Sequence, residues 1–228
     1  MVRWEGSRKS SHKGKGIGNI CADLTDRVIT GKEIKLKRIC VFCGSSPGNN
    51  SKYANSARKL GETLTEFDIT LIYGGSNIGL MGEIANSMIR RNGNVIGIIP
   101  QVLVEKEVAF THLQDLRIVN SMHERKALMA ELADGFISMP GGFGTLEETI
   151  EMLTWTQLGI HEKPLGLLNV EGYFDRLCEF IDHMVSEGFL VQGFRDMVLM
   201  DDNPEGLLNK LIKFSPPQID KWWVDKKG

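Results

Sequence analysis

The sequence predicts an α/β protein with a Rossmann-like, doubly wound sheet of about seven mostly parallel strands flanked by helices. Three observations support this fold class. Short apolar, β-prone runs alternate along the chain with segments of helical periodicity. Loops rich in glycine or serine directly follow three of these runs, as expected of ligand loops at the carboxyl ends of parallel strands. The 228 residues, 42% of them hydrophobic, are enough to bury the core of one such domain.

The predicted elements alternate regularly between strand and helix. The first strand, 38–43, is apolar on both faces, which is typical of a strand inside a parallel sheet. Further strands are predicted at 69–73, 95–99, 116–119, 135–139, 165–168 and 197–200. Helices are predicted at 52–67, 79–91, 122–132, 146–158, 173–187 and 205–212. The three loops 44–48, 74–76 and 141–144 follow strands and are therefore expected to converge on one crevice.

The composition divides the chain into three regions. We expect residues 1–36 to form a basic, flexible N-terminal extension, 37–213 a nucleotide-binding domain and 214–228 a C-terminal tail. Residues 1–37 hold nine Lys or Arg and four acidic residues, so the extension carries the excess of positive charge. Its segment Gly14–Asn19 resembles a dinucleotide fingerprint, but it ends in Asn and follows no strand. We expect the tail, with Trp222 and Trp223, to pack on the domain or on a second subunit.

Charge, hydropathy and cysteine spacing exclude several classes of protein. A net charge of −2 argues against general nucleic-acid binding, and no apolar run reaches the length of a membrane span. The extension contains acidic residues, which disfavours a transit peptide. The four cysteines lack CxxC spacing, and no His/Cys cluster suggests a metal site. We therefore expect a cytoplasmic protein that needs neither metal nor cofactor.

The glycine loop beginning at Pro140 is the strongest functional signal in the chain. It follows the strand 135–139 and leads into a helix. Glycines at this position let backbone N–H groups approach an anion, and the helix dipole adds positive charge at the first turn. The candidate binding residues are Gly141, Gly142, Phe143, Gly144, Thr145, Leu146 and Glu147. A phosphate group is the expected ligand.

Arg125 breaks the local rules for the helix 122–132. Ser121 and Glu124 form a capping box, so Glu124 has a structural role. Helical periodicity places Arg125 within the predicted buried stripe, which consists of Met122, Met129, Leu132 and Ala133. The helix dipole also disfavours a cation in the first turn. Arg125 either extends to solvent or pairs with a buried carboxylate for stability, or it forms an anion clamp with Lys126.

Glu148 has two interpretations. Thr145 to Glu148 fits a capping box, in which Glu148 would hold the start of the helix. On the other hand, Glu148, Met152 and Trp155 lie opposite the apolar face formed by Leu146, Ile150 and Leu153. A helix that is apolar on two sides is expected to pack against its own sheet and against another subunit. Glu148 would then face a ligand at the edge of that interface.

Several segments together resemble the LOG ("Lonely guy") family of cytokinin-activating phosphoribohydrolases. They are Met122–Lys126 and Pro140–Glu148, supported by Phe42–Ser46, Gly79–Gly82, Thr154–Gly159 and Lys163–Asn169. The resemblance covers about residues 38–212. It implies a Rossmann-like dimer, with higher oligomers open, that hydrolyses the N-glycosidic bond of AMP and of N6-prenylated adenosine 5'-monophosphates.

The resemblance also implies roles for individual residues. Arg125 and Glu148 match the catalytic pair of the family. The residues matched to substrate contact, together with those of the converging loops, are Glu107, Lys126, Gly142, Phe143, Gly144, Thr145, Thr154, Gly44, Ser45, Gly75, Ser76 and Met122. The family usually has a third glycine where this chain has Ser76. A serine there would either donate to phosphate or restrict the approach of the backbone.

Two other functions remain open at this stage. The same scaffold would serve a non-catalytic nucleotide carrier or sensor, because glycine loops bind phosphates without reacting. A lysine decarboxylase would use Lys126 as its Schiff-base residue, although nothing else in the sequence requires pyridoxal phosphate. For the hydrolase, the expected products are ribose 5-phosphate and a free adenine-type base.

Overall fold

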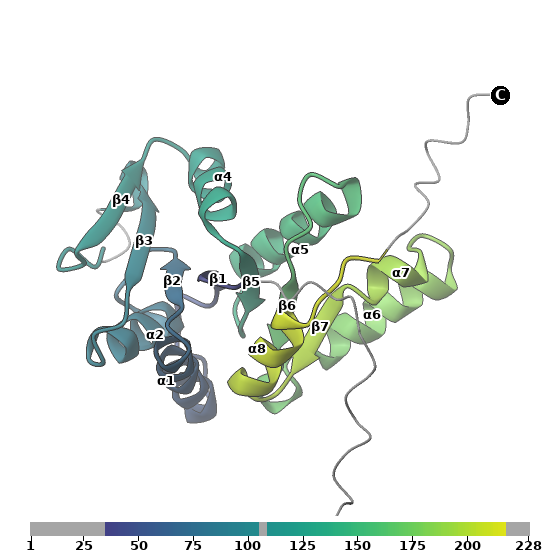
Figure 1. The fold of residues 1–228 in the computed structure, drawn as a ribbon, viewed down its shortest axis with the longest axis horizontal. Helices are drawn as coiled ribbons and strands as arrows, with labels where there is room; N and C mark the ends of the chain where they lie inside the picture. Colours follow the sequence, from purple (N-terminus) through teal and green to yellow (C-terminus); the bar gives the residue numbers. More distant parts are fainter. Residues whose placement is uncertain (1–34, 105–108, 218–228) are drawn as a thin grey trace, which may run out of the picture. The chain divides into compact units, whose positions relative to one another are not determined.

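The computed structural model describes residues 35–104 and 109–217 and confirms the predicted α/β fold (Figure 1). Seven strands form one sheet in the order β4-β3-β2-β1-β5-β6-β7, and every neighbouring pair is parallel. The strands are β1 (Arg38–Phe42), β2 (Thr70–Tyr73), β3 (Val95–Pro100), β4 (Asp115–Val119), β5 (Gly135–Ser138), β6 (Leu165–Leu168) and β7 (Val198–Asp201). All seven lie where the apolar runs predicted them, within one or two residues at each end.

The helices agree with the prediction except for short or irregular ones. They are α1 (Ser51–Glu66), α2 (Gly79–Ile89), α3 (Gln101–Val104), α4 (Met122–Leu132), α5 (Phe143–Leu158), α6 (Asp175–Ser186), α7 (Gln192–Arg195) and α8 (Pro204–Ile212), with a 3₁₀ turn, η1, at Val170–Gly172. The sequence did not predict α3, η1 and α7, which are too short to show helical periodicity. Helix α5 begins three residues earlier than predicted, because its first turn lies within the glycine loop.

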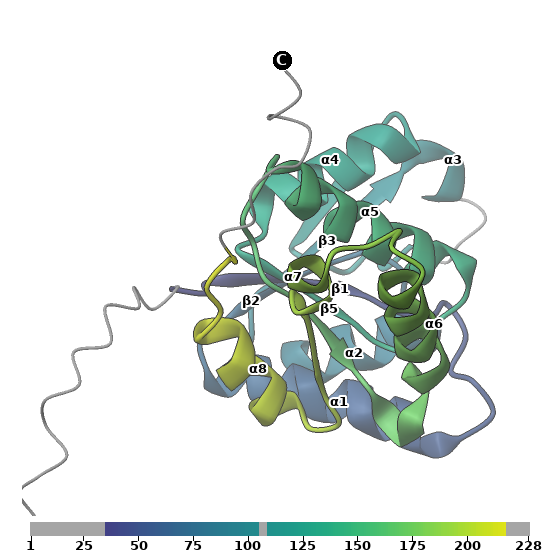
Figure 2. The same ribbon diagram turned by 90° about the vertical axis from the view of Figure 1, so that its right-hand side faces the viewer.

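Alternate side chains of each central strand enter two separate hydrophobic cores. From β1, Ile39 and Val41 pack against α1, α2 and α8, whereas Cys40 and Phe42 pack against α4, α5 and α6. In both Figure 1 and Figure 2, α4 and α5 lie on one side of the strands and α1 and α2 on the other. Covering both faces in this way explains why the strands are continuous apolar runs.

The order of the strands creates a switch point between β1 and β5. The chain builds the sheet outward from β1 to β4 and then returns to place β5 on the free edge of β1. The loops that leave β1 and β5 therefore run to opposite faces, and a crevice opens between them at the carboxyl ends of the strands. A hydrogen bond from Gly44 N to Pro140 O (3.0 Å) ties these two loops together at their bases.

The described residues include little of the predicted N-terminal extension and C-terminal tail. Residues 1–34 and 218–228 lie outside the described residues, and so does most of the predicted extension (1–36) and of the predicted tail (214–228). Phe214 at the start of the tail is buried against Phe194 and Met197, so the tail does begin by packing on the domain. Among the described helices, none combines the length and apolar character that crossing a membrane requires.

His161, just after α5, is a neutral histidine held in an apolar environment. Its ring lies 5.4 Å from the ring of Phe136 and 6.3 Å from that of Trp155. Within the described chain, its buried Nε2 has no hydrogen-bond partner. Burial, and secondarily the charge of Lys163, lowers the pKa of His161 to about 4. His161 is therefore protonated below about pH 6.5 in the unfolded chain, but only below about pH 4 in the folded chain.

We predict that His161 makes the protein lose stability as the pH falls from about 6.5 towards 4. His161→Phe keeps an aromatic ring but cannot titrate. Between pH 6.5 and 4.5 the free energy of unfolding of the wild type should fall by roughly 1–2 kcal/mol more than that of the variant, after allowance for the partial exposure of the ring. Urea unfolding at both pH values measures this difference. Equal losses in both proteins would show that the folded state protonates His161 freely.

Candidate active site

A pocket of about 330 Å³ opens where the loops after β1, β2 and β5 meet. Gly44, Gly74 and Gly142, one from each loop, line it, which confirms the predicted convergence. The other lining residues are Val41, Phe42, Cys43, Ser45, Met81, Leu103, Met122, Arg125, Met129, Phe143, Gly144, Thr145, Glu147 and Glu148. The pocket therefore combines a glycine loop, a cation, two carboxylates and a mostly apolar floor.

The first turn of α5 offers backbone donors to this pocket. Gly142 is the N-cap and supplies no side-chain hydrogen bond, so the N–H groups of Phe143, Gly144 and Thr145 precede the first bond of the helix, Leu146 N to Gly142 O. A Cβ atom at Gly142 or Gly144 would meet no heavy atom within 4 Å. The protein itself therefore does not need glycine at these two positions, whereas an anion approaching the backbone does.

Two contacts hold the glycine loop in place from behind. A Cβ atom at Gly141 would lie 2.1 Å from Thr145 Oγ1 and 2.9 Å from Gly44 N, so this glycine is required for packing. The Tyr173 hydroxyl donates to the carbonyl oxygen of Gly141 at 2.5 Å. Sequence reasoning missed Tyr173, because it lies after an irregular turn in a segment that shows only helical periodicity.

Arg125 and Glu148 meet in the pocket as a buried ion pair. Arg125 Nη2 lies 3.9 Å from Glu148 Oε1, and the two side chains are only 8% and 12% exposed. Arg125 comes from the first turns of α4 and Glu148 from the second turn of α5. The sequence predicted both residues as functional candidates, and the structure brings them together. Taking two charges out of water is costly, so the pair is weak evidence for stability and stronger evidence for a function.

Helix capping distinguishes the structural roles of Glu124 and Glu148. Ser121 does cap α4 by accepting from Glu124 N (3.1 Å), and Glu124 accepts from Asn120 N (2.8 Å), so the structural role of Glu124 is confirmed. The prediction that Glu148 belongs to a capping box is wrong. Thr145 is the third residue of α5 and not its N-cap, which leaves Glu148 beyond the positions that a box can use.

The predicted buried stripe of α4 is partly wrong. Met122 is 40% exposed, at the rim of the pocket, and the buried positions of α4 are Arg125, Lys126, Met129 and Ala130. Arg125 also depends on Gly74, because a Cβ atom at Gly74 would lie 2.3 Å from Arg125 Nη2. In the described chain, Arg125 Nε is buried and has no hydrogen-bond partner.

Lys126 does not line the pocket. Its ammonium donates to Glu147 Oε1 and to Glu151 Oε1 (3.0 Å) on α5. Burial alone lowers the pKa of Lys126, but the hydrogen bonds and charges of the two carboxylates outweigh it and leave the pKa raised. The side chain is therefore a protonated cation and is not a free amine nucleophile, which removes support from the Schiff-base role. Glu151 was not among the predicted site residues, although it follows Glu147 by one helical turn.

The remaining predicted site residues fall into three groups. Ser45, Phe143, Thr145 and Glu147 line the pocket. Gly75 and Ser76 do not: Gly75 O accepts from Phe110 N, and the fully buried Ser76 accepts from Ile78 N at 3.4 Å. Leu146 and Thr154 do not line the pocket either: Leu146 packs against the core, and the exposed Thr154 donates to Ile150 O (2.7 Å). Glu107 lies outside the described residues. Sequence reasoning missed Cys43, Met81, Leu103 and Met129, whose apolar character only suggested packing.

The prediction that α5 is buried on two opposite faces is only partly correct. Leu146, Leu153, Met152 and Trp155 all pack against the same core, and Thr145 and Thr149 lie within the buried side. Ile150 is instead 42% exposed, and Phe143 at the start of the helix is 94% exposed. Phe143 is therefore an exposed apolar side chain that lines the pocket, and Ile150 does not contribute to a second buried face of α5.

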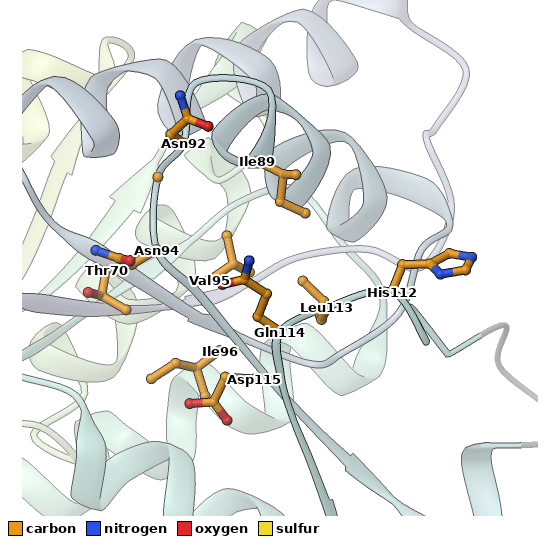
Figure 3. A pocket seen from close by; sticks show the side chains of 11 residues that line it. Thr70, Ile89, Asn92, Asn94, Val95, Ile96, His112, Leu113, Gln114 and Asp115 are labelled. Atoms are coloured by element: carbon orange, nitrogen blue, oxygen red, sulfur yellow. The ribbon is translucent and has the colours of Figure 1, made fainter.

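A larger hollow lies elsewhere in the described chain. It has a volume of about 610 Å³ and lies at the amino ends of β2, β3 and β4 (Figure 3). Thr70, Val95 and Asp115 mark these strand ends, and most of the other polar lining residues carry amides. Parallel sheets bind ligands at their carboxyl ends, so the smaller pocket is the better candidate. No group of three or more His, Cys, Asp or Glu residues suited to a metal occurs in the described part of the chain.

Comparisons with known proteins identify the family to which the chain is similar. A family model described as "Possible lysine decarboxylase" matches residues 81–211. The chain is 47% identical over 184 residues to a cytokinin riboside 5'-monophosphate phosphoribohydrolase of Arabidopsis thaliana, which covers 81% of this chain and 86% of the relative. It is 45% identical over 193 residues to an enzyme of the same name from Oryza sativa subsp. japonica, covering 84% and 80%.

Solved structures with the same fold are more distant in sequence. The molybdenum cofactor carrier protein of Chlamydomonas reinhardtii superposes with a TM-score of 0.58 at 17% identity, covering 77% of this chain and 95% of that one. The molybdenum cofactor binding protein of Rippkaea orientalis gives 0.57 at 20% identity, covering 77% and 95%. At this identity the likeness supports the fold alone. On the evidence of its close relatives, the chain belongs to the LOG family, whose curated members are named cytokinin riboside 5'-monophosphate phosphoribohydrolases.

Proposed function

We propose that this chain hydrolyses the N-glycosidic bond of AMP and of N6-prenylated adenosine 5'-monophosphates, with ribose 5-phosphate and the free base as products. The observation that carries the proposal is the buried Arg125–Glu148 pair at 3.9 Å, beside the open donors of α5 in one pocket. The close relatives are named for the same reaction on cytokinin riboside 5'-monophosphates. The proposed substrate is thus a small nucleotide.

In the proposed mechanism, α5 binds the phosphate and supplies Glu148, and α4 supplies Arg125. The N–H groups at the start of α5, together with its dipole, hold the 5'-phosphate. Breaking the C1'–N9 bond builds positive charge on the ribose, and the Glu148 carboxylate stabilises this charge and accepts a proton from the attacking water. The electron pair of the broken bond leaves with the base, which then takes up a proton. Arg125 orients the nucleotide and balances negative charge on the phosphate or the departing base. The mechanism uses neither metal nor cofactor.

The apolar rim of the pocket supports a homodimer. Phe143, Ile150 and Met122 are exposed on adjacent parts of α4 and α5, and Val102 and Ile118 are exposed as well. Single exposed apolar residues are common on protein surfaces, but Met122 and Phe143 both line the pocket, and Val102 is next to the lining residue Leu103. This grouping favours a protein partner. We propose that a second copy covers this rim. We also propose a cytoplasmic location, since Cys40, Cys43 and Cys178 are buried free thiols.

The direct test is Glu148→Gln. Glutamine has nearly the same shape but cannot accept a proton, so kcat for AMP should fall by about 10²- to 10⁴-fold while AMP still binds. The measurement is the release of ribose 5-phosphate and free base from AMP and from isopentenyladenosine 5'-monophosphate. Glu62→Gln is the matched control, because Glu62 on α1 pairs with Arg91, which follows α2, and does not line the pocket. Retained hydrolysis by Glu148→Gln would refute the catalytic role.

The same assay separates the hydrolase from a carrier or sensor. A carrier would bind AMP tightly and release no base over hours of incubation with the wild-type protein. The lysine decarboxylase would show the absorbance of pyridoxal phosphate in the purified protein. Either result would replace the proposed reaction.

Gly144→Ala tests the phosphate site without disturbing the fold. A Cβ atom at Gly144 has open space around it, and alanine favours a helix more than glycine does. The variant should therefore unfold at the same temperature as the wild type or a higher one. Its KM for AMP should rise by about tenfold, because the methyl group blocks the approach of phosphate to the backbone. An unchanged KM would place the phosphate elsewhere.

A further inference from the structure

Two ion-pair contacts lie side by side between α4 and α5. Arg125 on α4 faces Glu148 on α5, and the residue after Arg125 pairs with the residue before Glu148, Lys126 with Glu147. One turn further along α5, Glu151 accepts a second hydrogen bond from the same Lys126 ammonium at 3.0 Å. The catalytic pair is thus directly adjacent to a second bridge that joins the same two helices.

The Lys126 bridge has the properties of a fixed structural contact. Lys126 is 9% exposed as a whole residue, and its side chain is held by two carboxylates from successive turns of one helix. Two acceptors restrict the position of the ammonium along α5 as well as its distance from the helix. By contrast, the Arg125–Glu148 contact is longer, at 3.9 Å, and so constrains the helices less tightly.

The other end of α4 is also tied to the segment that follows α5. Lys163 Nζ donates to the carbonyl oxygens of Ala130 (2.6 Å) and Glu131 (3.4 Å) in the last turn of α4. A lysine at this position satisfies helix carbonyls that would otherwise lack partners. Helix α4 is therefore held near its beginning by Lys126 and at its end by Lys163. Of the two contacts, only that of Lys126 lies beside the reacting groups.

We propose that Lys126 is a positioning residue, which sets the distance between Arg125 and Glu148 by clamping α4 to α5, and that it does not bind the substrate phosphate. The proposal rests on the function proposed above. Lys126 does not line the pocket, and its hydrogen bonds are directed to Glu147 and Glu151. Displacing a catalytic group by about 1 Å costs on the order of 100-fold in rate, so a contact that fixes this spacing acts on turnover rather than on binding.

The test is Lys126→Met, which keeps the apolar stem and removes the charge. We expect kcat for AMP to fall by about 10- to 100-fold while KM, and inhibition by ribose 5-phosphate, change by less than about threefold. Lys126→Arg should recover most of the rate, because a guanidinium can also span two carboxylates. A tenfold rise in KM and in the inhibition constant with little change in kcat would show instead that Lys126 binds phosphate. An unchanged kcat in a folded but less stable variant would reduce the bridge to a stabilising contact.

A double-mutant cycle gives a second readout that does not depend on activity. Glu151 lies outside the pocket, so Glu151→Gln weakens the bridge without touching the lining residues. If the two residues form one clamp, the Lys126→Met and Glu151→Gln effects on kcat and on urea unfolding should not add. Additive effects on unfolding would refute the clamp even in a protein without turnover. Absence of base release by the wild type would count against the proposed function alone.

Discussion

The structure depends on the hydrogen bond that joins the loops after β1 and β5 at the centre of the sheet. Gly44 N reaches Pro140 O, and the absence of side chains at Gly44 and Gly141 lets the two backbones touch. This contact lies at the switch point of the strand order, where the chain stops building one half of the sheet and begins the other. Everything that defines the pocket is arranged around it: the loop after β2, the start of α5 and the first turns of α4.

The fold was predictable because the central strands are buried on both faces and most of the long helices are amphipathic or capped. These are local patterns, and they located all seven strands and the six long helices. The start of α5 was missed by three residues because Gly142 caps the helix without a side-chain bond, so the sequence carries no capping signal there. Helices α3 and α7 have four residues each, which is too short for a periodicity to be visible.

The candidate site was predictable only as far as single helices reveal it. Arg125 could be found because a cation on a buried helix face conflicts with local preferences, and burial of this side chain confirms the conflict. The hydrogen-bond partners of Lys126 could not be predicted, because they depend on how α4 and α5 pack against each other. The same limit applies to Tyr173, whose contact with Gly141 joins segments 32 residues apart. Met122 was misplaced because a small change in helix rotation moves a residue from the stripe to the rim.

The two halves of the pocket differ in what holds them. The proposed phosphate half is backbone, fixed by strand register and by the Gly44–Pro140 bond, and it depends on the absence of side chains at Gly142 and Gly144. The proposed reacting half consists of side chains on α4 and α5, and within the described part of the chain no backbone hydrogen bond joins these two helices. A buried ion pair at such a place has a desolvation cost that a hydrophobic contact would avoid. The chain retains three carboxylates and two cations between α4 and α5, which is expected if the spacing of charges, rather than stability, is what these helices provide.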